Sequence, residues 1–238
     1  MPSTPLLELR NVSCSVEPGQ PLFHDVNLSV NEGDILVLQG RSGCGKSTLL
    51  KCIAHLVLHD GETRYRGSTP QKQGIPSYRT RVLYVPQRPS LLPGTPRDFL
   101  KSISSLSAHK AASKTKPEAA AARAIERALE ISSAWAIEGE LWEREWSNLS
   151  GGEAQRIVLA VAVALNTAEV LLLDEPTSAL DAESSSMVEK YLVNEIHSDS
   201  MLKALVWITH SEEQGRRVGT RFIQLCAGGC TEDPTPPV

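Results

Sequence analysis

The chain has 238 residues, of which 41% are hydrophobic and 5% aromatic, enough for one sizeable α/β core and at most one small subdomain. Its 24 basic and 28 acidic residues give a net charge of −4, which excludes the basic surface typical of nucleic-acid-binding proteins. The five cysteines show no paired spacing, so we expect a reducing, cytosolic compartment rather than a disulfide framework.

Membrane and secretion signals are weak along the chain. The longest apolar stretch, Ile157 to Leu165, is less than half of the about 20 residues that a membrane-spanning helix needs. Residues 1–5 carry neither the basic nor the apolar region of a signal peptide. We therefore expect a chain that does not span a bilayer and that would need a separate partner to work at one.

The first predicted elements are short strands that lead to a glycine-rich loop. From residue 6 to about 40, short apolar runs alternate with turn clusters such as Asn31-Glu32-Gly33. The apolar run Ile35–Leu38 predicts a buried strand. It leads into a segment that fits the pattern G-x-x-x-x-G-K-[ST], made of Gly40, Arg41, Ser42, Gly43, Cys44, Gly45, Lys46, Ser47 and Thr48.

This segment has the chemistry of a phosphate-binding loop. Its glycines allow backbone N–H groups to turn inward around phosphates, while Lys46 can reach the β and γ oxygens and Ser47 can ligate Mg2+. A helix predicted over about residues 46–57 adds its positive N-terminal end to the same site.

The middle of the chain changes in composition. A strand at Val82–Val85 leads to Gln87, and residues 101–116 are rich in Ser, Ala and Lys without an apolar period. We interpret residues 101–116 as a mobile surface insertion rather than a core helix. Pro117 then predicts the start of a helix that runs to about Glu130. Three tryptophans that follow are interpreted as subdomain core: Trp135, Trp142 and Trp146.

A second glycine-rich loop contains Ser150, Gly151, Gly152 and Glu153, and it precedes an apolar helix predicted from Ala154 to Leu165. The N-terminus of such a helix has free backbone N–H donors, so the loop is a second candidate anion site. One chain cannot easily bring both anion sites to a single ATP.

The apolar run Val170–Leu173 predicts a buried strand that ends in two carboxylates. The carboxyl end of a parallel strand is where an α/β sheet places ligand groups, so Asp174 can hold Mg2+ and its water shell. Glu175 can polarise or orient an attacking water.

The C-terminal third continues the alternation. Strands at about 204–208 and 222–225 alternate with helices at about 181–198 and 210–217, which predicts an α/β fold with a mostly parallel sheet. Residues 231–238 are predicted to be a flexible tail.

Taken in order, these motifs resemble those of the ATP-binding-cassette (ABC) family over roughly residues 6–225. Leu149 to Glu153 resembles the signature motif, Gln87 the Q-loop glutamine, Ser178 to Asp181 the D-loop, and His210 the switch histidine. The resemblance implies a RecA-like P-loop NTPase core at about 6–90 and 166–230. It also implies a small antiparallel β subdomain and an inserted helical subdomain at about 91–165.

The resemblance also implies residue roles, with ATP and Mg2+ as cofactors. The hydrolytic residues would be Lys46, Gln87, Glu175 and His210. The Mg2+ residues would be Ser47, Gln87 and Asp174. ATP would be bound by the phosphate loop and, from a second cassette, by Ser150, Gly151, Gly152, Glu153 and Asp181.

For partners, the resemblance implies a second cassette, packed head to tail as a homodimer, and a separate transmembrane permease at the cytosolic face of a membrane. Residues 88–96 would line the permease groove, with Leu91 and Leu92 as apolar anchors. A soluble ATPase of iron–sulfur cluster or other complex assembly remains the alternative, although Leu149 and Ala154-Gln155-Arg156 resemble transporter cassettes more closely. Among transporters, the motifs look most like the bacterial Fet-type iron exporter and the plant aluminium-tolerance cassette, which suggests export of a metal ion or small conjugate.

One departure concerns the nucleotide base. Family members commonly stack an aromatic on adenine from a loop upstream of the phosphate loop, but Arg10 to Gln20 contains no Phe, Tyr or Trp. Phe23 is the next candidate along the chain. Since stacking of a base on an aromatic ring is worth about 1–3 kcal/mol, we expect ATP and GTP to bind within about tenfold of each other.

Overall fold

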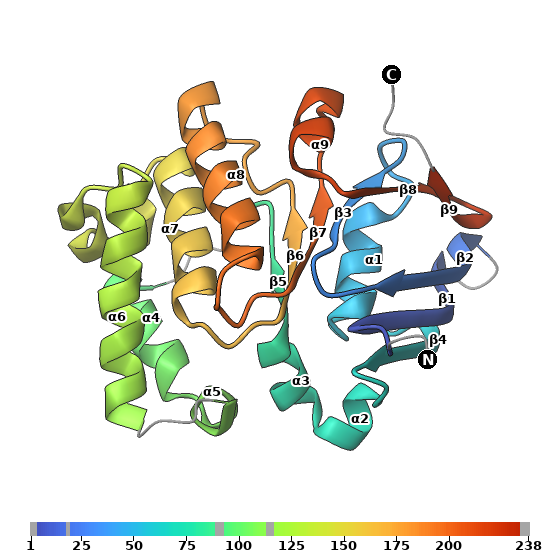
Figure 1. Cartoon of the computed structure of the whole chain (residues 1–238), viewed down its shortest axis with the longest axis horizontal. Helices are drawn as coiled ribbons and strands as arrows, with labels where there is room; N and C mark the ends of the chain where they lie inside the picture. Colours follow the sequence, from blue (N-terminus) through green and yellow to red (C-terminus); the bar gives the residue numbers. More distant parts are fainter. Residues whose placement is uncertain (1–3, 18–19, 89–92, 113–116, 234–238) are drawn as a thin grey trace.

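The computed structural model describes residues 4–17, 20–88, 93–112 and 117–233 (Figure 1). It contains two sheets, which confirms the predicted α/β class. The smaller is antiparallel, in the order β2-β1-β4, and is built from Leu7–Glu17, Gln20–Val30 and Asp60–Tyr65 for β1, β2 and β4.

The larger sheet has six strands in the order β5-β6-β7-β3-β8-β9. The strands from β5 to β8 are parallel, and β9 is added antiparallel at the edge. Parallel strands that are covered on both faces are apolar throughout, and β6 and β7 are accordingly buried at every position. The strands are Ile35–Gln39 (β3), Val82–Val85 (β5), Val170–Asp174 (β6), Ala204–Ile208 (β7), Arg221–Cys226 (β8) and Gly229–Asp233 (β9).

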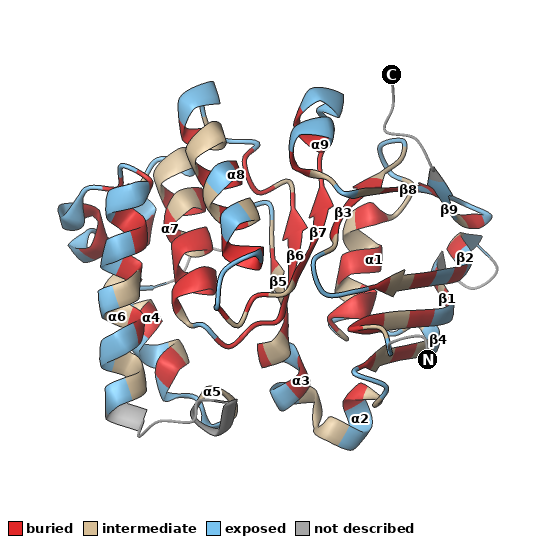
Figure 2. Ribbon diagram, viewed as in Figure 1, coloured by how far each residue is buried: buried red, intermediate tan, exposed pale blue. Residues whose placement is uncertain are grey.

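Helices cover both faces of this sheet (Figure 1). Helix α1 (Lys46–Ile53) lies between the two sheets, in a core that joins Leu7 of β1, Leu50 of α1 and Leu36 of β3. The other face packs on α7 (Gly151–Ala164) and α8 (Ala182–Ile196), and its core extends outward to α6 (Pro117–Ala134). The buried positions follow these layers (Figure 2). The remaining helices are α2 (Pro70–Gln73), α3 (Ile75–Arg81), α4 (Pro96–Ser105), α5 (Ser107–Ala112), α9 (Glu212–Val218) and two 3-10 turns, η1 (Gly139–Glu143) and η2 (Trp146–Asn148).

Residues 101–116 were predicted to be a mobile surface insertion rather than a core helix, but the structure places residues 101–105 in α4 and residues 107–112 in α5. Most side chains described at 101–109 are nevertheless exposed. Helix α4 is capped by Thr95, whose side chain accepts a hydrogen bond from the backbone N–H of Asp98. The helix buries Leu100 and Ser104. The Ser104 hydroxyl donates a hydrogen bond to the backbone carbonyl of Leu100 at 2.7 Å. Phe99, Leu100 and Ile103 form a short apolar face that packs on the main core. This face begins before residue 101, so the composition of residues 101–116 alone did not reveal it.

Helix α6 extends past the predicted end at Glu130 to Ala134, because Ile131 and Trp135 are fully buried and continue its apolar face. The interpretation of the three tryptophans as core is confirmed. Trp135, Trp142 and Trp146 are exposed by 0%, 2% and 4%.

Other helix ends differ from the prediction because local caps decide them. Asp181 and Ser211 are N-caps rather than helical residues, so α8 and α9 begin at 182 and 212. Helix α1 ends at Ile53 instead of residue 57, since His55 adopts a left-handed backbone (φ 53°). The N–H of Leu56 then returns to the carbonyl of Lys51 at 2.8 Å, which is the usual way a helix is closed by a left-handed residue.

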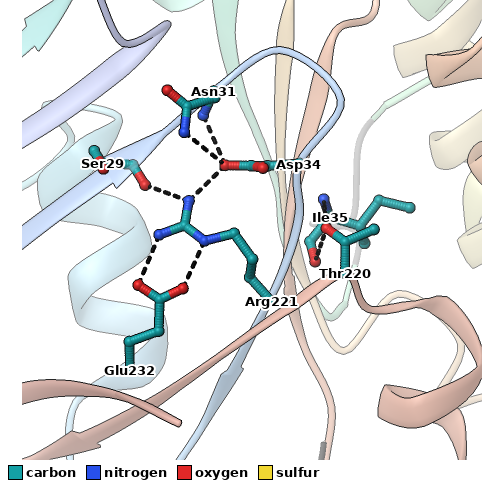
Figure 3. A network of polar contacts seen from close by, with 7 residues as sticks. All are labelled: Ser29, Asn31, Asp34, Ile35, Thr220, Arg221 and Glu232. Carbon is teal, nitrogen blue, oxygen red and sulfur yellow. Dashed lines mark hydrogen bonds and ion pairs between the residues drawn. The ribbon is translucent and has the colours of Figure 1, made fainter. Parts of the chain in front are cut away.

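The predicted flexible tail is wrong for residues 231–233, which belong to β9, while residues 234–238 lie outside the described part of the chain. An ion-pair network holds this edge (Figure 3). The Arg221 guanidinium on β8 donates to both carboxylate oxygens of Glu232 at 2.7 and 2.8 Å. It also donates to Asp34 at 2.5 Å and to the carbonyl of Ser29 at 2.8 Å. One arginine therefore ties β9 to β8 and both to the end of β2.

We expect His55 to make the fold acid-sensitive. Burial, then the nearby His59 and Arg79, lower the pKa of His55 to about 4. Because the unfolded chain binds this proton more readily, the fold should lose at most about 3 kcal/mol of stability as pH falls from 6.5 to 4. His55→Asn removes the titration, and Asn tolerates the left-handed backbone. Urea unfolding at several pH values should therefore show a flatter pH profile for the variant than for the wild type, whereas identical slopes would contradict the assignment.

Candidate functional site

The phosphate-binding loop joins the carboxyl end of β3 to helix α1. Lys46 is the first residue of α1 and only 6% exposed, although it is charged. Its ammonium group donates to the carbonyls of Gly40 and Arg41 at 2.8 and 3.2 Å, so it lies across the base of the loop. Residues 41–43 are exposed, and the rest of the loop is partly buried.

Position 45 requires a glycine for two reasons, its backbone conformation and the lack of room for a side chain. Its φ of 99° is left-handed, and a Cβ there would lie within 2.7 Å of Leu22 and 2.9 Å of Phe23. Phe23 is fully buried in this contact. It packs beneath the loop, so the suggestion that Phe23 replaces the missing adenine-stacking aromatic was wrong. The partly buried Leu22 is the apolar side chain nearest to this turn of the loop.

Asp174 lies at the carboxyl end of β6 and is 5% exposed. Its two carboxylate oxygens accept hydrogen bonds from different elements. The hydroxyl of Ser47, on α1, donates to Oδ1 at 2.9 Å, and the hydroxyl of Tyr84, on β5, donates to Oδ2 at 2.9 Å. Burial and then Asp174 raise the pKa of Tyr84 above its ordinary value, so this hydroxyl stays protonated and donates.

These oxygen donors suit Mg2+, which uses one or two carboxylates together with phosphate oxygens and water. Among the residues that the structure describes, no three or more His, Cys, Asp and Glu side chains are grouped to hold a metal by themselves. Ser47 and Asp174 therefore fit a cation that arrives with a phosphate. Gln87, the third predicted Mg2+ residue, instead donates its amide to Glu175.

Three of the predicted hydrolytic side chains converge. Glu175 follows β6 in a left-handed backbone conformation (φ 48°), which is unusual for a residue with a side chain. One of its carboxylate oxygens accepts from the Gln87 amide at 2.7 Å, and the other lies 3.0 Å from Nε2 of His210. The carboxyl ends of β5, β6 and β7 thus bring Gln87, Glu175 and His210 to one point.

The second glycine-rich loop forms the N-terminal cap of helix α7. Helix α7 begins at Gly151, three residues before the predicted start, because Ser150 and Glu153 form a reciprocal capping box. The backbone N–H of Ser150 donates to the Glu153 carboxylate at 2.6 Å, and this bond lowers the pKa of Glu153. Within the described part of the chain, neither residue hydrogen bonds to the loop at 40–48.

Asp181 likewise caps the helix that follows it, α8. Its carboxylate caps α8 by accepting from the backbone N–H of Ser184 at 2.8 Å and from the Ser184 hydroxyl at 3.0 Å. These bonds lower the pKa of Asp181, which is exposed. Among the described residues, the signature loop and Asp181 thus have no hydrogen bond to the glycine-rich loop at 40–48 of the same chain.

Two further residues, Tyr84 and Gln214, lie at the site but were not predicted from the sequence as site residues. Tyr84 was predicted only as part of the strand at Val82–Val85, and no pattern in the sequence places its hydroxyl beside Asp174. Gln214, on α9, is buried and donates its amide to Thr177 and to Glu189, both at 2.7 Å. It lines a pocket of about 460 Å³ that also contains Glu175 and His210.

A glycine-rich loop follows β3, a serine and an aspartate are hydrogen bonded at the end of β6, and a glutamate lies between a glutamine and a histidine. This arrangement is the one expected of a P-loop ATPase of the cassette class. Comparison with known proteins narrows this class. The family model described as ABC transporter matches residues 23–178. The chain belongs to the ABC transporter family, and it is an ATPase that uses ATP with Mg2+.

Relatives and solved structures agree with this assignment. The chain is 34% identical to the phosphate import ATP-binding protein PstB 1 of Vibrio parahaemolyticus over 230 residues, 92% of this chain and 80% of that protein. It is 33% identical to the sulfate/thiosulfate import ATP-binding protein CysA 2 of Agrobacterium fabrum, over 89% of this chain and 59% of that one. A solved dimeric ATP-binding cassette in a post-hydrolysis state with ADP and Pi superposes with a TM-score of 0.79 at 27% identity, covering 95% of this chain and 97% of that chain.

No helix in the described ranges is both long and apolar enough to cross a membrane.

The crowding at Gly45 predicts a difference between two glycines of the loop. Gly43 has a φ of 79°, and a Cβ there would meet no atom of the described residues within 4 Å, so Gly43→Ala bears only backbone strain of about 1–2 kcal/mol. Gly45→Ala adds a clash with Leu22 and Phe23, so we expect it to lower the unfolding free energy by more than Gly43→Ala does and to weaken ATP binding further. Urea unfolding and nucleotide titration measure both; equal losses in the two variants would contradict the packing argument.

Proposed function

We propose that this chain is the ATP-hydrolysing motor of an ABC transporter, working as a head-to-tail dimer that drives a separate membrane permease. The observation that supports this most directly is the Glu175 carboxylate, held between Gln87 and His210 and adjacent in sequence to Asp174. A carboxylate held on both sides at the end of β6 is placed to act on a water that attacks a bound phosphate.

The residue roles follow from this placement. Backbone N–H groups of the loop and the Lys46 ammonium bind the β and γ phosphates, with phosphate oxygens replacing the carbonyls that Lys46 now contacts. Ser47 and Asp174 hold Mg2+, which when bound neutralises developing charge on the phosphates. Glu175 accepts the proton of the attacking water, or orients that water, while His210 and Gln87 fix the position of its carboxylate.

The dimer is proposed because each chain separates its two anion sites. The signature loop, Ser150 to Glu153, opens α7 with exposed backbone and has no hydrogen bond to residues 40–48 in the described structure. A second cassette supplies the missing half, with Ser150, Gly151, Gly152 and Asp181 of one chain facing the phosphate loop of the other. The dimeric state of the solved cassette supports this arrangement.

A permease surface is proposed on the segment that follows Gln87. Residues 89–92, which include the expected anchors Leu91 and Leu92, lie outside the described residues. Two other large apolar side chains are exposed after helix α1, Leu56 by 47% and Leu58 by 97%.

Cargo and direction are a finer proposal. The resemblance to the Fet-type exporter and to the plant aluminium-tolerance cassette suggests export of a metal ion or small conjugate. The names of two relatives instead describe import of phosphate and of sulfate or thiosulfate. Since the permease selects the cargo, a transport assay of the assembled complex must include both metal ions and these oxyanions.

The hydrolytic roles predict two distinct losses. Lys46→Ala should abolish both tight ATP binding and turnover. Glu175→Gln should keep ATP binding but reduce turnover by about 10²–10⁴-fold, the usual contribution of a general base, and accumulate an ATP-bound dimer. Steady-state hydrolysis and size-exclusion chromatography in ATP measure these effects. Glu138→Gln, at an exposed site, is the matched control; near-normal turnover of Glu175→Gln would refute the assigned role.

The transporter assignment predicts a membrane partner. Tagged Glu175→Gln, held in ATP and recovered from detergent-solubilised native membranes, should co-purify a polytopic membrane protein, and Lys46→Ala should recover less of it. Recovery of soluble partners alone would instead favour the alternative, a cassette ATPase that drives assembly of another complex.

A further inference from the structure

Helix α7 carries a glutamine that reaches the hydrolytic site of its own chain. Gln155 lies one turn after the start of α7 and is 3% exposed. Its amide nitrogen donates to the backbone carbonyls of Gln87 and Glu175, each at 3.0 Å. Its amide oxygen accepts from the backbone N–H of Ala179, also at 3.0 Å.

The orientation of this amide is settled by its partners. Two carbonyls can only accept and one N–H can only donate, so a flipped amide would face like groups at all three contacts. Both hydrogens of the Gln155 amide are therefore donated to backbone carbonyls of the site, those of Gln87 and Glu175. The partners lie in two loops, the one that follows β5 and the one between β6 and α8, so the amide joins two segments that are distant in the sequence.

These loops are the ones that carry the reacting groups. Gln87 and Glu175 contact each other through their side chains, and Ala179 lies two residues before Asp181. Glu175 also has the left-handed φ of 48°, a conformation that costs energy and persists where the surroundings hold it. Its carbonyl accepts from the Gln155 amide at 3.0 Å and from the Ser178 N–H at 3.2 Å. Gln155 is thus one of the two donors that hold this backbone.

The first turn of α7 packs closely against the predicted D-loop, Ser178 to Asp181. A Cβ on Gly152 would lie 3.0 Å from the carbonyl of Ala179. Farther along α7, Ile157 and Leu159 are fully buried in the main core. The signature loop, Gln155 and the loop around Ala179 are therefore connected to one another through direct contacts.

We propose that Gln155 is a positioning residue that couples the signature loop of one cassette to the hydrolytic residues of the same cassette. This inference rests on the proposed head-to-tail dimer. When the signature loop of a chain closes on the nucleotide of its partner, Gln155 transmits that closure to the backbone of Glu175 and Gln87 in its own chain. The two composite sites of the dimer are thereby linked through α7.

Mixed dimers can separate this role from general support of the helix. In the first arrangement, a Gln155→Met chain pairs with a Glu175→Gln chain, so the one Glu175 that supports hydrolysis belongs to the Gln155→Met chain, whose signature loop still faces a site that binds ATP. In the second, a Gln155→Met, Glu175→Gln chain pairs with a wild-type chain, so the Gln155→Met chain supplies only the signature loop to the active site. Wild type paired with Glu175→Gln is the reference.

We expect the first arrangement to lose about tenfold in kcat with ATP affinity retained, and the second to stay within about twofold of the reference. Gln155→Glu keeps the acceptor for Ala179 but loses both donors, and it should reproduce this pattern if the methionine variant folds poorly. Ser132→Ala, which removes a buried hydroxyl bonded to Trp142 in the helical region, controls for loss of stability.

The two arrangements are compared by how far each lowers kcat relative to the reference. If the decrease in the first is less than five times the decrease in the second, the proposal is overturned, because Gln155 would then support the helix or the signature contact rather than its own hydrolytic site. A reference dimer that failed to form or to hydrolyse ATP would instead contradict the proposed dimeric motor itself.

Discussion

The hydrogen bonds to Asp174 are the constraint on which the site depends. A buried carboxylate needs partners, since an unpaired charge in the interior costs several kcal/mol. Here the partners are the hydroxyls of Ser47 on α1 and Tyr84 on β5. The carboxylate at the end of β6 therefore joins the helix that begins at the glycine-rich loop to the strand that leads to Gln87.

The same rule applies along the boundaries between elements. Glu189, Glu195 and Glu169 are buried, and each is paired with an arginine from another element. Arg217 of α9 bonds Glu189 of α8 at 2.6 Å, and Arg66 after β4 bonds Glu169 at 2.6 Å. Arg127 of α6 pairs with Glu195 at the end of α8. Directional pairs of this kind specify how neighbouring elements are placed, whereas apolar contacts alone tolerate shifts.

Two residues with left-handed backbone lie at the candidate site. Gly45 has a left-handed φ in the phosphate loop, and Glu175 has one although it carries a side chain. Both are held by surrounding contacts, Gly45 by Leu22 and Phe23 and Glu175 by donors from Gln155 and Ser178. The backbone at Glu175 is therefore held in this conformation by contacts within the chain.

Much of this could be predicted from the sequence. The glycine pattern at 40–48, the apolar run that ends at Asp174 and Glu175, and the strand that ends at His210 predicted the α/β class and the candidate site residues, because local patterns determine strands, loops and helix starts. The roles of those residues remain proposals. The nearby helix ends were missed by a few residues, since Asp181, Ser211 and the left-handed His55 decide them through individual caps.

The tertiary structure alone decided the contacts between distant segments. Sequence spacing cannot show that Tyr84 bonds Asp174, that Gln155 reaches Gln87, Glu175 and Ala179, or that Arg221 joins β9 to Asp34. The sequence by itself determined which elements form and which chemical groups they carry, because those depend on neighbours along the chain. Which side chains meet depends on how the sheet orders its strands, and that order exists only once the core has packed.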